Sequence, residues 1–229
     1  MKFRKFSLLV LFLLPLALFG QKKPLTHDDY DGWKSLRQQS ITDNGEWIKY
    51  EINPQEGDGT LYLYNVKKKS QEKFDRGFSS DFSAGNDFFA FLIKPEFDVT
   101  RQAKKDKKKP DEMPKNNLGI KLIPDGEMLT VERVKSFKVF EKKGSWIAYL
   151  MEKPLPEKKE KKEKQEGEEN VTPAEEKAQA PRGGGRNGAK ADGTELVIYN
   201  PVTKSSHSFM DVVDYTLAKD GETIGFVQS

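Results

Sequence analysis

The sequence contains no cysteine and only two histidines, His27 and His207, among its 229 residues. Without cysteine the chain has no disulfide framework and no thiol chemistry, so its stability depends on packing alone. The two histidines are the only imidazole bases available for hydrolysis, and neither lies in a setting that suits a catalytic base. Long apolar runs are also missing after residue 20, so no stable membrane insertion is expected beyond that point.

Net charge is missing as well once the first twenty residues are set aside. The formal charge is +3, and Lys2, Arg4 and Lys5 account for it because no acidic residue accompanies them. The rest of the chain is neutral and lacks the net positive charge that favours binding to nucleic acid, so no nucleic-acid partner is predicted.

The first twenty residues have the pattern of a secretory signal. Basic residues precede an apolar run from Leu8 to Phe19, and the small residue Gly20 follows. This pattern predicts a signal peptide over residues 1–20 that is removed from an exported protein, either periplasmic or secreted. An uncleaved membrane anchor is the alternative, although the run is short for a span.

A ten-residue phrase occurs four times after this signal. Each copy passes from an apolar residue through a polar turn with Gly or Asn into a short apolar strand that closes on Tyr or Phe. The copies are ITDNGEWIKY from Ile41, FSAGNDFFAF from Phe82, FEKKGSWIAY from Phe140 and LAKDGETIGF from Leu217. A second phrase, LYLYNVKKKS from Leu61, returns as LVIYNPVTKS from Leu196. Such self-similarity predicts units that stack on their neighbours.

Two charged segments interrupt the repeats. Residues 100–116 are rich in lysine and are predicted to form a surface loop, whereas residues 153–192 contain no aromatic residue and are predicted to be disordered. Without these segments the phrases recur about every 40 residues, the period of four-stranded propeller blades. The sequence therefore predicts an all-β fold, an incomplete β-propeller over residues 41–229 with about three blades and the start of a fourth. A solenoid and a sandwich are the alternatives.

Residues 21–40 are expected to form a short helical lead-in. Thr26 with the acids that follow it suits a helix start, and Trp33 and Leu36 are expected to point inward. The acids Asp28, Asp29 and Asp31 beside His27 could instead hold a hard cation. They lack the Gly and closing Glu of an EF-hand loop, so helix capping is favoured and no metal or cofactor is predicted.

No residue of the chain is predicted to be catalytic. The segment Gly77-Phe78-Ser79-Ser80-Asp81 comes nearest to a GxSxG elbow, but it lacks the second Gly and the strand-turn-helix context.

The remaining charged and aromatic groups are likewise not predicted to form a binding site. The lysine runs 104–109 and 158–164 and the pairs Glu168-Glu169 and Glu175-Glu176 are interpreted as solvated charge. Trp33, Trp47 and Trp146 are interpreted, with the aromatic residues that close the phrases, as packing between units rather than as a ligand box.

The segment from Thr26 through SITDNGEWIKY resembles the start of the mature propeller in secreted bacterial members of the prolyl oligopeptidase family. Asp29 and Trp33 contribute to this resemblance, as do the segments INPQEGDGTLYLYN and TRQAKKDKKKPDEMPKNNLGI. The resemblance implies a propeller that restricts access of short peptides to an α/β-hydrolase domain, which supplies the Ser, Asp and His. These 229 residues contain no such domain, so none of the family's catalytic residues carries over to this chain.

The fourth phrase is expected to provide only the first strand of its unit. The chain is therefore interpreted as the N-terminal portion of a longer exported serine peptidase, with short peptides as partners of the hydrolase domain. A non-enzymatic exported propeller that serves as a protein-binding scaffold is the alternative. A surface-binding protein that acts through its lysine-rich segments is a third hypothesis.

Overall fold

The computed structural model describes residues 26–30, 32–123, 126–140, 142–154, 192–218 and 221–229. The predicted signal peptide and most of the predicted disordered segment, residues 155–191, lie outside this range. None of the helices in the described ranges is long and apolar enough to cross a membrane.

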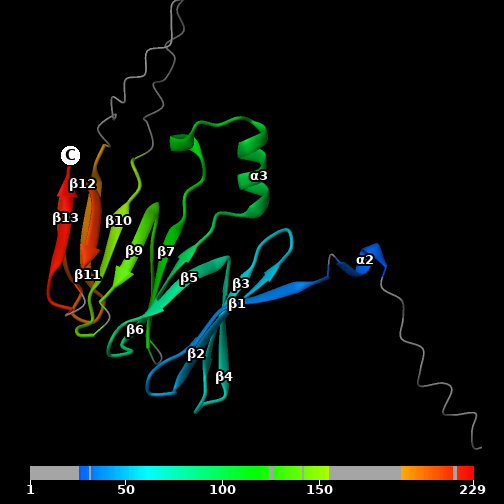
Figure 1. Cartoon of the computed structure of the whole chain (residues 1–229), viewed down its shortest axis with the longest axis horizontal. Helices are drawn as coiled ribbons and strands as arrows, with labels where there is room; N and C mark the ends of the chain where they lie inside the picture. Colours follow the sequence, from blue (N-terminus) through cyan, green and yellow to red (C-terminus); the bar gives the residue numbers. More distant parts are fainter. Residues whose placement is uncertain (1–25, 31, 124–125, 141, 155–191, 219–220) are drawn as a thin grey trace, which may run out of the picture.

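Three antiparallel sheets stand side by side in an open arc (Figure 1). The first sheet contains β1 (Lys34–Ile41), β2 (Trp47–Pro54), β3 (Thr60–Asn65) and β4 (Ser70–Asp75). The second contains β5 (Gly77–Phe82), β6 (Phe88–Ile93), β7 (Asn117–Leu122) and β8 (Met128–Val131). The third contains β9 (Val134–Val139), β10 (Ile147–Met151), β11 (Thr194–Asn200), β12 (Ser205–Leu217) and β13 (Ile224–Gln228). Neighbours in sequence are neighbours in each sheet, as in propeller blades, so the predicted all-β propeller fold is confirmed.

The repeated phrases occupy equivalent places in this arrangement. Each copy of the ten-residue phrase contains the turn between the first and second strands of a unit, at β1–β2, β5–β6, β9–β10 and β12–β13. The second phrase contains the turn after the third strand. Its Asn closes that turn, because Asn65 Oδ1 accepts from the Lys68 amide at 2.8 Å and Asn200 Oδ1 accepts from the Thr203 amide at 3.0 Å.

The fourth unit differs from the prediction of a single strand. Strand β12 is shared: Ser205 to Val212 pair with β11, and Val212 to Leu217 pair with β13. The fourth phrase therefore forms a two-stranded hairpin that continues the third sheet. Strand β12 changes partner near Asp211, which has positive φ and lies at a register shift in the pairing with β11.

The chain passes from each unit to the next through one residue with positive φ. These residues are Arg76, Arg133 and Asp211, with φ of 62°, 56° and 61°. Their carbonyls accept hydrogen bonds from the amides of Lys94 at 2.9 Å, Glu152 at 2.7 Å and Ser229 at 2.9 Å. A non-glycine residue in this region is strained, so the same bond at all three junctions offsets part of that cost.

Alternate side chains of each second strand pack toward opposite neighbours. Phe89 and Phe91 of β6 are buried against the first sheet, and Phe88, Ala90 and Leu92 are buried against the third. Tyr149, which closes the third phrase, packs toward the second sheet. The closing residues Phe91 and Tyr149 thus provide packing between units, as predicted, whereas Tyr50 of the first phrase stacks on Tyr62 within its own sheet.

The lead-in contains less helix than expected. Helix α2 (His27–Tyr30) has four residues, and β1 begins at Lys34. Trp33 and Leu36 do not point inward: they are 47% and 60% exposed. The reason is that β1 gains ladder pairing with β2 on both sides of a bulge between Arg37 and Ser40, which a short isolated helix cannot match.

The segment predicted as a loop over residues 100–116 is partly helical. It contains most of helix α3 (Phe97–Lys105) and the 3₁₀ turn η2 (Pro110–Glu112). Asp98 in the first turn of α3, and Lys104 and Lys105 in its last turn, complement the helix dipole, and Ala103 is buried. The composition of the segment masked this short amphipathic pattern.

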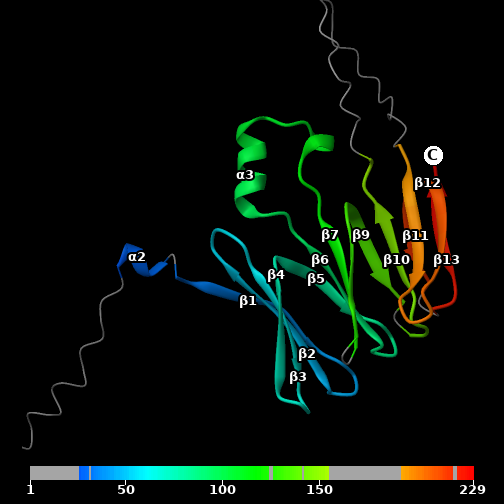
Figure 2. The same ribbon diagram turned by 180° about the vertical axis from the view of Figure 1, so that it is seen from behind.

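The two rims of the arc are built differently (Figure 2). Helix α3 and the ends of the second charged segment lie on one rim, and the phrase turns lie on the other. On the turn rim, Ser145 Oγ donates to Asp87 of the preceding turn, and Lys143 Nζ lies 3.0 Å from Glu222 Oε1 of the following turn. The second, third and fourth turns are thereby bonded to one another.

Candidate functional site

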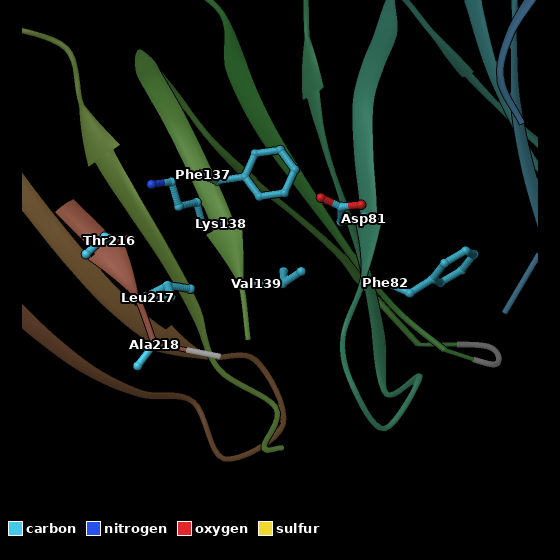
Figure 3. Close-up of a pocket in the computed structure, with 8 residues that line it drawn as sticks. All are labelled: Asp81, Phe82, Phe137, Lys138, Val139, Thr216, Leu217 and Ala218. Atoms are coloured by element: carbon cyan, nitrogen blue, oxygen red, sulfur yellow. The ribbon is translucent and has the colours of Figure 1, made fainter. Parts of the chain in front are cut away.

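A cavity of about 470 Å³ lies where the first strands of the second, third and fourth units converge (Figure 3). In a propeller this position corresponds to the central channel. The lining residues are Asp81 and Phe82 from β5, Phe137, Lys138 and Val139 from β9, and Thr216, Leu217 and Ala218 from the end of β12.

Strand register makes the polar residues of this cavity equivalent to one another. Asp81 pairs with Ala90, Lys138 with Ala148 and Thr216 with Gly225, and these three partners hold the same place in their phrases. In the first unit the equivalent residue is Ser40, which pairs with Lys49. One position of the repeat thus presents a serine, an acid, a lysine and a threonine in successive units.

A buried lysine fixes the acid at this position. Lys49 Nζ donates to the Ser80 carbonyl and lies 3.0 Å from Asp81 Oδ1, although the Asp81 side chain is 62% exposed. Glu51, also buried, accepts a hydrogen bond from the Ser79 amide at 3.0 Å through Oε1. Ser79 has φ 48° in a bulge of β5. Two charged side chains of β2 therefore hold the bulge that presents Asp81.

The lysine of the third unit makes a similar contact. Lys138 Nζ donates to the Tyr215 carbonyl at 2.8 Å and lies 4.9 Å from the centre of the Tyr215 ring. The Tyr215 hydroxyl is buried and donates to the Ala148 carbonyl at 3.2 Å. Burial raises the pKa of Tyr215 from 10.0 to about 12.

This raised pKa predicts a loss of stability at alkaline pH. Above pH 10 the unfolded chain releases the Tyr215 proton while the folded chain keeps it, so stability falls as pH rises from about 10 to about 12, by about 2–3 kcal/mol. We expect Tyr215→Phe to remove this part of the pH dependence, at a cost of about 1 kcal/mol at neutral pH for the lost hydrogen bond. Urea unfolding of both proteins at neutral and alkaline pH measures the difference, and parallel curves would contradict it.

The serine-rich segment does not form a nucleophile elbow. Ser79 and Ser80 lie within β5, whose next element is a strand. Ser80 Oγ is buried and has no hydrogen-bond partner among the described atoms. His207 lies on β12 with its ring 6.0 Å from that of Trp146, and the His27 side chain is outside the described residues.

The other candidate groups lie apart from the cavity. Asp29 accepts from the Thr26 amide at 2.7 Å and so caps α2, while the side chain of Asp28 and residue Asp31 are not described. The lysine run 104–109 is exposed at the end of α3; the run 158–164 and both Glu pairs fall outside the described ranges. Among the described side chains no group of three or more acids and histidines is placed to hold a metal ion.

A second cavity, of about 610 Å³, lies at the base of the second charged segment. Two of its lining residues form an ion pair: Lys153 Nζ lies 2.6 Å from Asp192 Oδ2. Lys153 follows β10 and Asp192 precedes β11, so they are the first and last residues of the charged segment. Their hydrogen bond raises the pKa of Lys153 and lowers that of Asp192. The pair holds the two ends of the segment together.

The sequence did not single out Lys49, Glu51 or Lys138, and it named Asp81 only as the last residue of the segment rejected as a nucleophile elbow. A signal was present in the phrase alignment. Where the first unit has Lys49, the other units have Ala90, Ala148 and Gly225, and where it has Glu51, they have Leu92, Leu150 and Val227. A charged residue at a repeat position that is small or apolar in the other units indicates that this side chain has a role other than apolar packing.

Comparison with known proteins gives structural similarities only. No protein-family model and no curated protein sequence matches the chain. A solved prolyl endopeptidase structure aligns at 10% identity and a TM-score of 0.42, covering 78% of this chain and 22% of that one. The β-propeller domain of the trilobed protease from Pyrococcus furiosus aligns at 10% identity and 0.46, covering 84% and 47%. Pyrococcus horikoshii acylaminoacyl peptidase aligns at 9% and 0.43, covering 85% and 28%. The chain thus spans between about a fifth and a half of the length of these proteins.

Proposed function

We propose that the chain is the propeller portion of an exported serine peptidase of the prolyl oligopeptidase type, in which it limits access of peptides to a hydrolase domain outside these 229 residues. The observation that carries the proposal is the cavity among the first strands of three successive units. Its volume of about 470 Å³ lies in the range of small-ligand cavities and suits a short peptide segment. The resemblance of the opening segment to secreted members of that family supports the same function.

The packing of the sheets also supports a sizing role. Apolar side chains are buried and close-packed between successive sheets, so the sheets hold fixed positions relative to one another and form a rigid wall around the cavity. A wall of this kind discriminates by size because it does not rearrange to admit a larger substrate. Export is proposed from the first twenty residues alone.

The test is a peptidase assay on the full-length protein. We expect cleavage of short proline-containing or acyl-peptide chromogenic substrates, little cleavage of casein, and loss of activity when the serine of the predicted downstream GxSxG motif is replaced by alanine. Absence of such a motif, or activity that survives this replacement, would contradict the proposal.

The non-enzymatic scaffold has one observation in its favour. Helix α3 projects from the second sheet on one rim, exposes Val99 in its first turn and carries lysines in its last turn, and an exposed helix is one mode of binding a partner. Full-length protein without serine-dependent activity that forms a stable complex lost on Val99→Asp would favour the scaffold over the peptidase.

A further inference from the structure

At two of the interfaces between units, a lysine ammonium group donates a hydrogen bond to a backbone carbonyl of the following unit. At the first interface, Lys49 donates to the carbonyl of Ser80, the residue before Asp81. At the third, Lys138 donates to the carbonyl of Tyr215, the residue before Thr216. Asp81 and Thr216 are equivalent by strand register, so both lysines reach the same carbonyl position of the following unit. Each ammonium also lies near an aromatic ring, Phe82 at 5.9 Å and Tyr215 at 4.9 Å.

The middle interface has no lysine at either donor position. The carbonyl equivalent to those of Ser80 and Tyr215 belongs to Phe137, because Phe137 precedes Lys138. The residue equivalent to Lys49 is Ala90, and the residue equivalent to Lys138 is Asp81. A methyl group and a carboxylate cannot donate, so this interface presents acceptors where its neighbours hold an ammonium.

The cavity described above lies at this interface. Asp81 and Phe137 both line it, from the facing strands β5 and β9 (Figure 3). Lys49 contacts one carboxylate oxygen, Oδ1, and a carboxylate has further lone pairs that can accept. Lys138 stands on the β9 wall, but its ammonium is bonded to the Tyr215 carbonyl and lies against the Tyr215 ring, which directs it away from Asp81.

We propose that this cavity binds a primary ammonium group of a peptide, in the place that a lysine side chain occupies at the interfaces on either side. The Asp81 carboxylate accepts a charge-assisted hydrogen bond, the Phe137 carbonyl accepts a second, and the Phe137 ring provides a cation–π contact. A single carboxylate and one carbonyl are too few oxygens for a hard metal cation, which takes six or more, whereas they match the three donors of an ammonium.

The ammonium can come from a peptide amino terminus or from a lysine side chain. This inference rests on the proposed function, because it requires that a peptide reaches the cavity. It adds that the cavity selects peptides that carry a positively charged nitrogen. An amino-terminal preference would orient the substrate with its free end in the arc. A lysine preference would select by sequence.

Three peptides separate these sources by calorimetric titration of the full-length protein. Ala-Ala-Ala-amide carries an α-ammonium, N-acetyl-Ala-Lys-Ala-amide carries an ε-ammonium, and N-acetyl-Ala-Ala-Ala-amide carries neither. We expect at least one ammonium peptide to bind about tenfold or more tightly than the uncharged peptide, the effect of a charge-assisted hydrogen bond. Equal affinity for all three, or no binding of either ammonium peptide at millimolar concentration, would overturn the proposal.

Variants locate the site. Asp81→Asn is expected to weaken the ammonium peptide about tenfold and to leave the uncharged peptide unchanged, because the amide keeps the size of the side chain and loses its charge. Asp43→Asn, an exposed acid in the first phrase turn, is the matched control and should change neither. Phe137→Leu should weaken the ammonium peptide a few-fold through loss of the cation–π contact. Unchanged affinity in both Asp81→Asn and Phe137→Leu would place the binding elsewhere.

These results are separable from a failure of the proposed function. Serine-dependent cleavage with no preference for ammonium peptides would overturn the ammonium site alone. Ammonium-selective binding without serine-dependent cleavage would overturn the peptidase and retain the site.

Discussion

Phe91→Ala is expected to lower the free energy of unfolding by about 3–5 kcal/mol, the range for deleting a fully buried aromatic ring. Phe91 has no exposed surface and packs against Phe74 and Phe89, with ring centres 4.5 Å and 5.6 Å away. The ring also fills the space over Gly119, where an added Cβ would stand 2.7 Å from Phe91 Cζ. The cavity left by alanine is therefore bounded by backbone and cannot collapse fully.

Chemical denaturation of the wild type and the variant measures this effect. Leu36→Ala is the matched control, because Leu36 is also apolar and on a strand but is 60% exposed. We expect the control to change stability by less than about 1 kcal/mol. A Phe91→Ala effect as small as that of the control would show that the first and second sheets do not depend on this contact.

The second large effect is expected at the buried charges of β2. Lys49→Ala leaves the Ser80 carbonyl and Asp81 without their donor, and Glu51→Leu leaves the Ser79 amide without its acceptor. Each single change is expected to cost about 2–4 kcal/mol, since each leaves buried polar groups unpaired.

The double variant Lys49→Ala/Glu51→Leu should cost less than the sum of the two, by about 1 kcal/mol or more. It installs the residue types found in the third unit, Ala148 and Leu150, and removes both buried charges together. A double-mutant cycle by chemical denaturation gives the coupling. Strict additivity would show that the two side chains act independently on the bulge.

The repeat made much of the fold accessible from the sequence. Alternation within the phrase predicted second strands such as Phe88 to Ile93, and the closing Phe91 and Tyr149 were assigned to packing between units, where they lie. Both followed from one physical rule, that a sheet with two apolar faces must be covered on both sides.

The candidate site could not be obtained in the same way. Asp81 and Lys138 occupy one position of the repeat only by strand register. Lys138 pairs with Ala148, ten residues further along the chain, whereas Asp81 pairs with Ala90, nine residues further along, because the β9–β10 turn has one more residue. This difference in turn length shifts Lys138 by one place relative to its phrase, so alignment of the phrases does not match it with Asp81. The short helix α3 was missed for a different reason: its lysines outweighed the one buried face.

Both rims of the arc carry bonds that join successive units. On the turn rim, Ser145 contacts Asp87 and Lys143 contacts Glu222. On the opposite rim, Arg101 of α3 lies 3.5 Å from Glu56 of the first unit, and Lys115 lies 3.3 Å from Glu152 of the third. The second and third units are thus bonded to each other at both rims, so the interface that holds the cavity cannot open like a hinge about either rim without breaking a polar contact.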